Sequence, residues 1–141
     1  MKRIKLYEDF NGVDSIIQNL EDICLELNDK GIRTECSHNV PSKKYAPLPG
    51  QREHISVGLE EDLYSDDYKG EMVFGKIQDV VLRILDYMKS CGWKPSFVIF
   101  DGVSYHIEKN TEDAIQWLLK NFKSEGVLSG LTINFIRDET H

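Results

Sequence analysis

The segment SFVIFDGVSYHIE, residues 96–108, decides the fold because it has the pattern of two short strands joined by a two-residue turn. Asp101-Gly102 suits a type I′ turn, in which both central residues have positive φ and the backbone twist matches that of the strands. This turn sets a register of four pairs: Phe100 with Val103, Ile99 with Ser104, Val98 with Tyr105, and Phe97 with His106. The face expected to pack on helices carries Val98, Phe100, Val103, Tyr105 and Ile107.

Three segments around this hairpin have the 3.6-residue period of amphipathic helices. They are expected at residues 13–28, 73–89 and 112–124. Asn11 and Thr111 are the expected N-caps of the first and third segments. The expected stops at their ends are Gly31, Cys91-Gly92 and Gly126. Each segment has one apolar stripe, so each of the three helices is expected to pack that stripe against a sheet.

Further strands are expected at 32–37, 54–59 and 131–137, beside hairpin strands at 96–100 and 103–108. Their period-two alternation predicts a polar sheet face that contains His54, Ser56, Thr132, Asn134, His106, Arg33 and Glu35. The fold class is therefore α/β (α+β), a two-layer sandwich with a mostly antiparallel sheet and three helices on one face. The preferred topology is a ferredoxin-like variant, βαββαβ with an added hairpin and helix.

Length and composition predict one domain, residues 1–141, with a single core. The formal net charge of −7 disfavours nucleic acid and anionic membranes as partners and is compatible with a basic protein partner. Cys24, Cys36 and Cys91 match neither a disulfide framework nor a zinc motif, so reduced thiols in a cytoplasm are expected. No segment has the pattern of a signal peptide or the length of a membrane span.

Two long loops are predicted. Residues 38–53 contain Lys43, Lys44, Tyr45 and Arg52, a locally basic set that would suit a phosphate or an acidic partner, although a solvated loop is the simpler interpretation. Residues 60–69 are acidic but lack the spaced oxygen ligands and glycine turn of an EF-hand. No metal site is therefore predicted, and Cys36, His38 and His54 match no common zinc spacing.

The sequence His54-Ile55-Ser56-Val57 resembles one half of the signature of the two-histidine phosphoesterases. That resemblance implies a groove in which two imidazoles act as base and acid on a cyclic or 2′-linked phosphate, with His54, Ser56 and His106 as the catalytic residues. The second half departs from the signature, because Glu108 stands where a hydroxyl is expected and would repel phosphate. The alternative is that both histidines are ordinary polar-face residues, with His106 beside Phe97.

Other catalytic motifs are absent from the sequence. It has no phosphate-binding glycine loop, dinucleotide fingerprint, nucleophile elbow or zinc-protease motif, so no cofactor is predicted. The leading functional prediction is a small acidic module that binds a protein partner through the exposed sheet face or the 43–52 loop. An unpaired edge strand would also allow a homodimer.

Met1-Lys2 followed by Tyr7-Glu8-Asp9-Phe10 resembles the amino-terminal leader of many small proteins of large, myovirus-type tailed phages. The resemblance implies a phage accessory protein, located in the host cytoplasm or inside the virion, that acts by binding. In this chain Asp9 separates Glu8 from Phe10. Residues 1–10 are therefore expected to be a leader, an edge strand or a short helix that covers the core.

Overall fold

The computed structural model describes residues 2–40, 53–61, 72–107 and 110–138, and their side chains from residue 12 onward. The helices are α1 (Lys2–Asn28), α2 (Phe74–Ser90) and α3 (Thr111–Asn121). The strands are β1 (Ile32–Asn39), β2 (His54–Glu61), β3 (Met72–Val73), β4 (Trp93–Phe100), β5 (Val103–His106), β6 (Val127–Leu128) and β7 (Gly130–Arg137).

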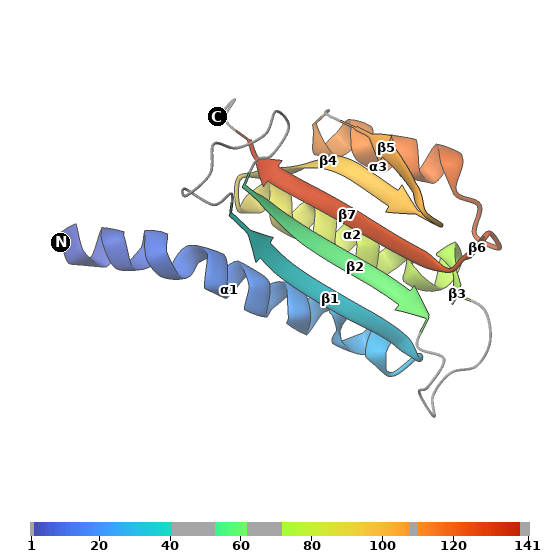
Figure 1. Cartoon of the computed structure of the whole chain (residues 1–141), viewed down its shortest axis with the longest axis horizontal. Coiled ribbons are helices and arrows are strands. Elements are labelled where there is room, and N and C mark those ends of the chain that lie inside the picture. Colours follow the sequence, from blue (N-terminus) through green and yellow to red (C-terminus); the bar gives the residue numbers. More distant parts are fainter. Residues whose placement is uncertain (1, 41–52, 62–71, 108–109, 139–141) are drawn as a thin grey trace.

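Five strands form the main sheet in the order β1-β2-β7-β4-β5, with every neighbouring pair antiparallel, while β3 and β6 form a separate short pair. From β2 to β7 the main elements follow the order βαββαβ, and α1 and β1 precede them. In each βαβ crossover one strand lies between the two connected strands: β7 between β2 and β4, and β4 between β5 and β7. The helices lie on one side of the sheet (Figure 1), so the predicted α+β fold class is confirmed.

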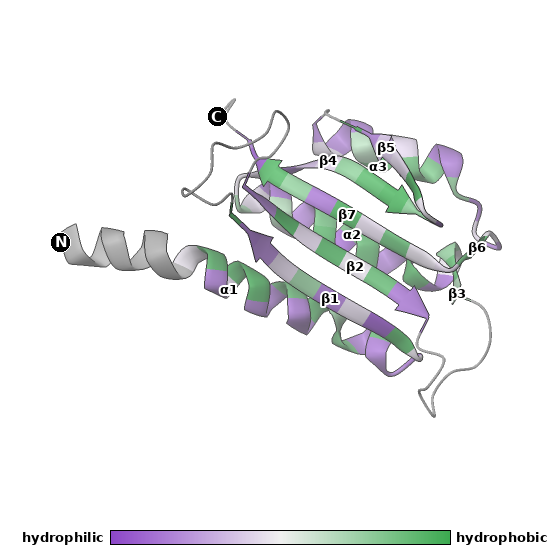
Figure 2. Cartoon of the chain, viewed as in Figure 1, coloured by the Kyte–Doolittle hydropathy of each residue, from purple (hydrophilic) through white to green (hydrophobic). Residues whose placement is uncertain are grey.

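Helix α2 supplies the centre of the core, as its apolar stripe predicted. Its buried residues are Phe74, Ile77, Val80, Val81, Ile84, Leu85 and Met88. Alternate residues of two inner strands of the sheet pack against them: Ile55, Val57 and Leu59 of β2, and Leu131, Ile133 and Phe135 of β7. Figure 2 shows the corresponding alternation of polar and apolar residues along these strands. One face of each strand is therefore buried and the other is polar.

The hairpin forms as predicted from Asp101-Gly102. Asp101 has φ 51° and Gly102 has φ 83°, the positive values that a type I′ turn requires. The register between β4 and β5 pairs Phe97 with His106 and Phe100 with Val103. The local turn therefore determines which side chains this hairpin presents on each face.

The predicted boundaries at the amino terminus were wrong. Helix α1 begins at Lys2 rather than near Val13, so Asn11 is not its N-cap and residues 2–10 are helical rather than an edge strand. At the other end Gly31 has φ 78° and ends the helix as expected.

Helix α3 also differs at both ends. Its N-cap is Asn110 rather than Thr111, because the Asn110 side chain accepts a hydrogen bond from the backbone N–H of Asp113 at 2.8 Å. It ends at Asn121 rather than Ser124, because Phe122 is extended and its ring stacks on Phe74, with the ring centroids 5.0 Å apart. Tertiary packing of one aromatic side chain therefore shortens the helix.

Two glycines with different backbone conformations test this fold, because an added Cβ meets nothing within 4 Å at either position. Gly102→Ala places a Cβ at φ 83° and should lower the free energy of unfolding by about 1–2 kcal/mol. Gly12→Ala lies within α1, where an added Cβ meets nothing within 4 Å, and should raise it by about 0.5–1 kcal/mol. Urea unfolding measures both changes, and a shift of the same sign in the two variants would contradict the assigned backbone conformations.

Candidate functional site

The candidate site is the sheet face opposite the helices, which we call the open face. Strand register places one row of residues across all five strands: Ser37, Ser56, Asn134, Phe97 and His106. Within this row the Ser56 hydroxyl donates a hydrogen bond to Asn134 Oδ1 at 2.6 Å. In Figure 1 this face is turned toward the viewer and the ribbon of α2 runs behind it. The predicted polar face is therefore present, with small hydroxyl and amide side chains near its centre.

A hollow lies at the end of the open face that contains Gly58 of β2 and Gly130 of β7. It consists of two adjoining depressions of about 130 and 310 Å³ that share Glu60, Gly130 and Thr132. The first is also lined by Gly58, and the second by Ile99. Gly58 and Gly130 have no side chains to fill the space above the sheet, so we call this feature the glycine hollow.

The rim of the glycine hollow is mostly acidic. Glu35 and Glu60 lie on one side with Arg33, whose guanidinium pairs with Glu60, and Asp101 lies on the other. The Ser129 hydroxyl and backbone N–H both donate hydrogen bonds to Asp101 Oδ1, at 2.7 and 2.8 Å, and these bonds lower the pKa of the Asp101 carboxyl. With three carboxylates and one guanidinium, the rim favours a cationic group over an anion.

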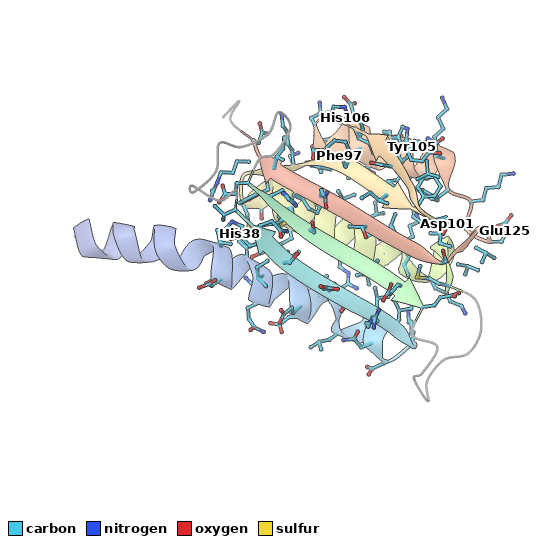
Figure 3. All side chains as sticks on the ribbon, viewed as in Figure 1. His38, Phe97, Asp101, Tyr105, His106 and Glu125 are labelled. Atoms are coloured by element: carbon cyan, nitrogen blue, oxygen red, sulfur yellow. The ribbon has the colours of Figure 1, made fainter. Side chains whose placement is uncertain are left out.

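An aromatic pair lies farther along the open face. The rings of Phe97 and His106 stack with their centroids 4.6 Å apart and their planes at 18°, and Phe97 is 37% exposed. Figure 3 shows the two side chains next to each other on β4 and β5. On the helix side of the same edge, Tyr105 stacks on Phe100 at 4.8 Å and is 38% exposed. This edge of the sheet therefore presents apolar ring surface to solvent.

The structure places His54, Ser56 and His106 on the open face but does not bring the histidines together. His54 is on β2 and His106 on β5, with β7 and β4 between them. Three strand spacings of about 4.8 Å correspond to roughly 14 Å along the sheet. An acid and a base that act on one phosphate each lie within hydrogen-bond reach of it, so this spacing gives the phosphoesterase alternative little geometric support.

A polar cluster that the sequence did not reveal joins the ends of the basic loop. His38, near the end of β1, and Glu53, just before β2, are the first and last residues of the predicted 38–53 loop. His38 Nε2 lies 2.9 Å from Glu53 Oε2. The Nε of Arg137 donates to Glu53 Oε1 at 2.6 Å, and its guanidinium lies 4.6 Å from the centroid of the Trp93 ring. This cluster of four residues, which we call the loop clamp, connects β1, β4 and β7 to the residue that precedes β2.

The loop clamp stabilises the charged form of Glu53. The hydrogen bond from Arg137 is the main cause of the lowered pKa of this carboxyl, and His38 contributes to the same shift. The predicted binding residues of the loop itself, Lys43, Lys44, Tyr45 and Arg52, lie outside the described residues. The sequence pattern gave no sign of the clamp, because its members are distant in the chain and come from different strands.

Within the described ranges, no three His, Cys, Asp or Glu side chains gather as metal ligands would, and no helix has the length and apolar character needed to cross a membrane. The fold and site define a small α+β two-layer protein with an open, polar sheet face. No family model, curated protein or solved structure matches the chain.

The loop clamp predicts a pH-dependent contribution to stability. Because the pKa of Glu53 lies below its ordinary value of 4.5 in the folded chain, the contribution is complete above about pH 5 and is lost as the pH falls through the lowered pKa. Glu53→Gln should lower the free energy of unfolding at pH 7 by about 0.5–1 kcal/mol, as for a partly exposed ion pair, and the difference from the native chain should shrink toward pH 3.

Urea unfolding at several pH values measures this effect. Glu125→Gln is the matched control, because Glu125 is exposed and lies far from His38 (Figure 3). A difference between the Glu53→Gln variant and the native chain that stays constant from pH 7 to pH 3 would show that the charge of Glu53 does not support the clamp.

Proposed function

We propose that this chain is a small binding module that engages another protein through the open face. The observation that carries the proposal is that no helix of the described residues covers this face of the five-stranded sheet. The face presents small polar side chains, a hollow and exposed ring surface. A face of this kind supplies hydrogen-bonding groups and apolar contacts together, as protein interfaces do.

The charge of the open face indicates which kind of partner surface would fit. Glu35, Glu60 and Asp101 surround the glycine hollow, so a lysine or arginine side chain of the partner would fit there. Phe97 and His106 would contact an apolar or aromatic side chain of the same partner. The net charge of −7 supports a basic protein surface over nucleic acid.

The biological setting of the proposal comes from the amino terminus. The similarity of Met1-Lys2 and Tyr7–Phe10 to phage leaders supports an accessory protein of a tailed phage, acting in the host cytoplasm or packaged in the virion. Mass spectrometry of purified virions distinguishes packaging in the virion from a location in the host cytoplasm.

The homodimer expected from an unpaired edge strand also stays a prediction. The outer strands of the described sheet are β1 and β5, and sedimentation of the purified chain measures the oligomeric state.

A charge-matched pair of variants tests the open face. Thr132→Arg puts a long cationic side chain into the glycine hollow. Gln116→Arg makes the same change of charge at an exposed position of α3, in the helix layer. Proteins retained from the native host by the wild-type bait should be retained by Gln116→Arg and reduced at least about tenfold by Thr132→Arg, because the added side chain fills the hollow and repels a basic partner.

Two further variant baits distinguish binding by the open face from binding by the 43–52 loop. Phe97→Ala should weaken the same interactions as Thr132→Arg if the open face binds as one surface. The triple change of Lys43, Lys44 and Arg52 to alanine tests the loop. Equal recovery of every partner by Thr132→Arg, Phe97→Ala and the wild type would overturn the proposal.

The phosphoesterase alternative has its own test. Because His54 and His106 are separated by two strands, we expect no hydrolysis of cyclic dinucleotides or of 2′,3′-cyclic nucleotides above the rate of a His54→Ala control. Turnover by the wild type that His54→Ala abolishes would establish the alternative and count against a purely binding role.

A further inference from the structure

Two neighbouring parts of the open face lie on one strand, β4. Phe97 supplies exposed ring surface, and Ile99, two residues further along the strand, lines the second depression of the glycine hollow. Residues two apart on a strand point to the same face and are separated by about 6.5–7 Å. The ring surface and the hollow are therefore adjacent, and the geometry of the strand sets the distance between them.

Polar side chains of β7 lie beside both parts. Strand register places Asn134 next to Phe97 and Thr132 next to Ile99. The Ser56 hydroxyl donates a hydrogen bond to Asn134 Oδ1, and the Nδ2 of the same amide has two N–H donors. An extended chain has backbone N–H and C=O groups that need partners, whereas a helix satisfies most of them internally. These polar side chains therefore favour an extended segment over a helix as the ligand.

The second depression has carboxylates on opposite sides and an apolar wall. Glu60 of β2, Asp101 of the hairpin turn and Ile99 all line it. A guanidinium has five N–H donors in a planar fork and can contact two carboxylates at once, whereas an ammonium is a compact point charge. The methylene groups of an arginine side chain would also pack on Ile99. The depression therefore fits arginine better than lysine.

We propose that the open face binds an extended peptide segment in which an arginine lies two residues from an aromatic residue. This inference rests on the proposed binding function of the open face and specifies the chemistry of the partner. The aromatic side chain packs on Phe97 and His106, and the arginine enters the second depression. Alternate side chains of an extended segment repeat every 6.5–7 Å or so, which is about the spacing of Phe97 and Ile99. The backbone groups of the segment face Asn134 and Thr132.

Two peptides of identical composition test the spacing. In Gly-Arg-Ser-Trp-Ser-Arg-Gly an arginine lies two residues from the tryptophan on each side, so either chain direction satisfies the motif. In Gly-Ser-Arg-Trp-Arg-Ser-Gly each arginine adjoins the tryptophan and points to the opposite side of an extended chain. Fluorescence anisotropy of the labelled peptides with the whole protein should show binding of the first and at least about tenfold weaker binding of the second.

Substitutions in the protein test the ring surface and the hollow separately. Phe97→Ala should weaken binding of the first peptide at least about tenfold. Asp101→Asn removes one carboxylate charge from the hollow, and asparagine tolerates the positive φ of this position. It should weaken binding of the first peptide about threefold and leave a peptide with glutamine in place of arginine unaffected. Asp86→Asn is the matched control, because Asp86 is exposed on α2 in the helix layer. Circular dichroism checks the fold of each variant.

Equal affinity of the wild type for the two peptides would overturn the inference, and so would equal effects of Asp101→Asn and Asp86→Asn. The outcome is distinguishable from failure of the proposed function. If Thr132→Arg abolishes retention of host proteins while neither peptide binds at up to about 1 mM, the open face binds a partner but not through this motif. If the open-face variants retain every host protein as the wild type does, the proposed function itself is wrong.

Discussion

The structure depends on the burial of helix α2 against the inner strands β2 and β7. Seven residues of α2 are buried, and the alternate residues of both strands that face it have almost no exposed surface. Helices α1 and α3 join this layer beside α2, over β1 and over β4 with β5. Hydrophobic burial is the largest favourable term in folding, so this one-sided layer sets the position of every other element.

One-sided burial has a direct consequence for the opposite face. With the apolar set turned to the helices, period-two alternation leaves Ser56, Asn134 and Thr132 on the open face, together with Gly58 and Gly130. The glycine hollow arises where small residues of neighbouring strands coincide, and the loop clamp holds the opposite end of the sheet through Glu53 and Arg137. The candidate site is therefore a product of the same packing that forms the core.

Local sequence predicted the parts of the fold that local chemistry controls. Asp101-Gly102 set the hairpin register correctly, and the apolar stripe of α2 contained all of its buried residues except Phe74. One error occurred where a distant contact competes with local propensity, because Phe122 leaves the helix to stack on Phe74. The error at the N-cap of α3 was local, because the side chain of Asn110 rather than Thr111 accepts the hydrogen bond from the backbone of Asp113. The bulge between Pro95 and Phe97 lets β4 extend back to Trp93, beyond the strand expected from Ser96.

The sequence by itself determined the fold class, the covered and open faces of the sheet, and the presence of His54, Ser56 and His106 on the open face, because turn chemistry and hydrophobic periodicity act over a few residues. Only the tertiary structure decided the distances between those residues. Strand β7, from the end of the chain, enters the sheet between β2 and β4 and separates His54 from His106. The same long-range pairing assembles the glycine hollow and the loop clamp. No local pattern encodes these contacts, because each joins elements that are distant in the sequence or fixed only by packing.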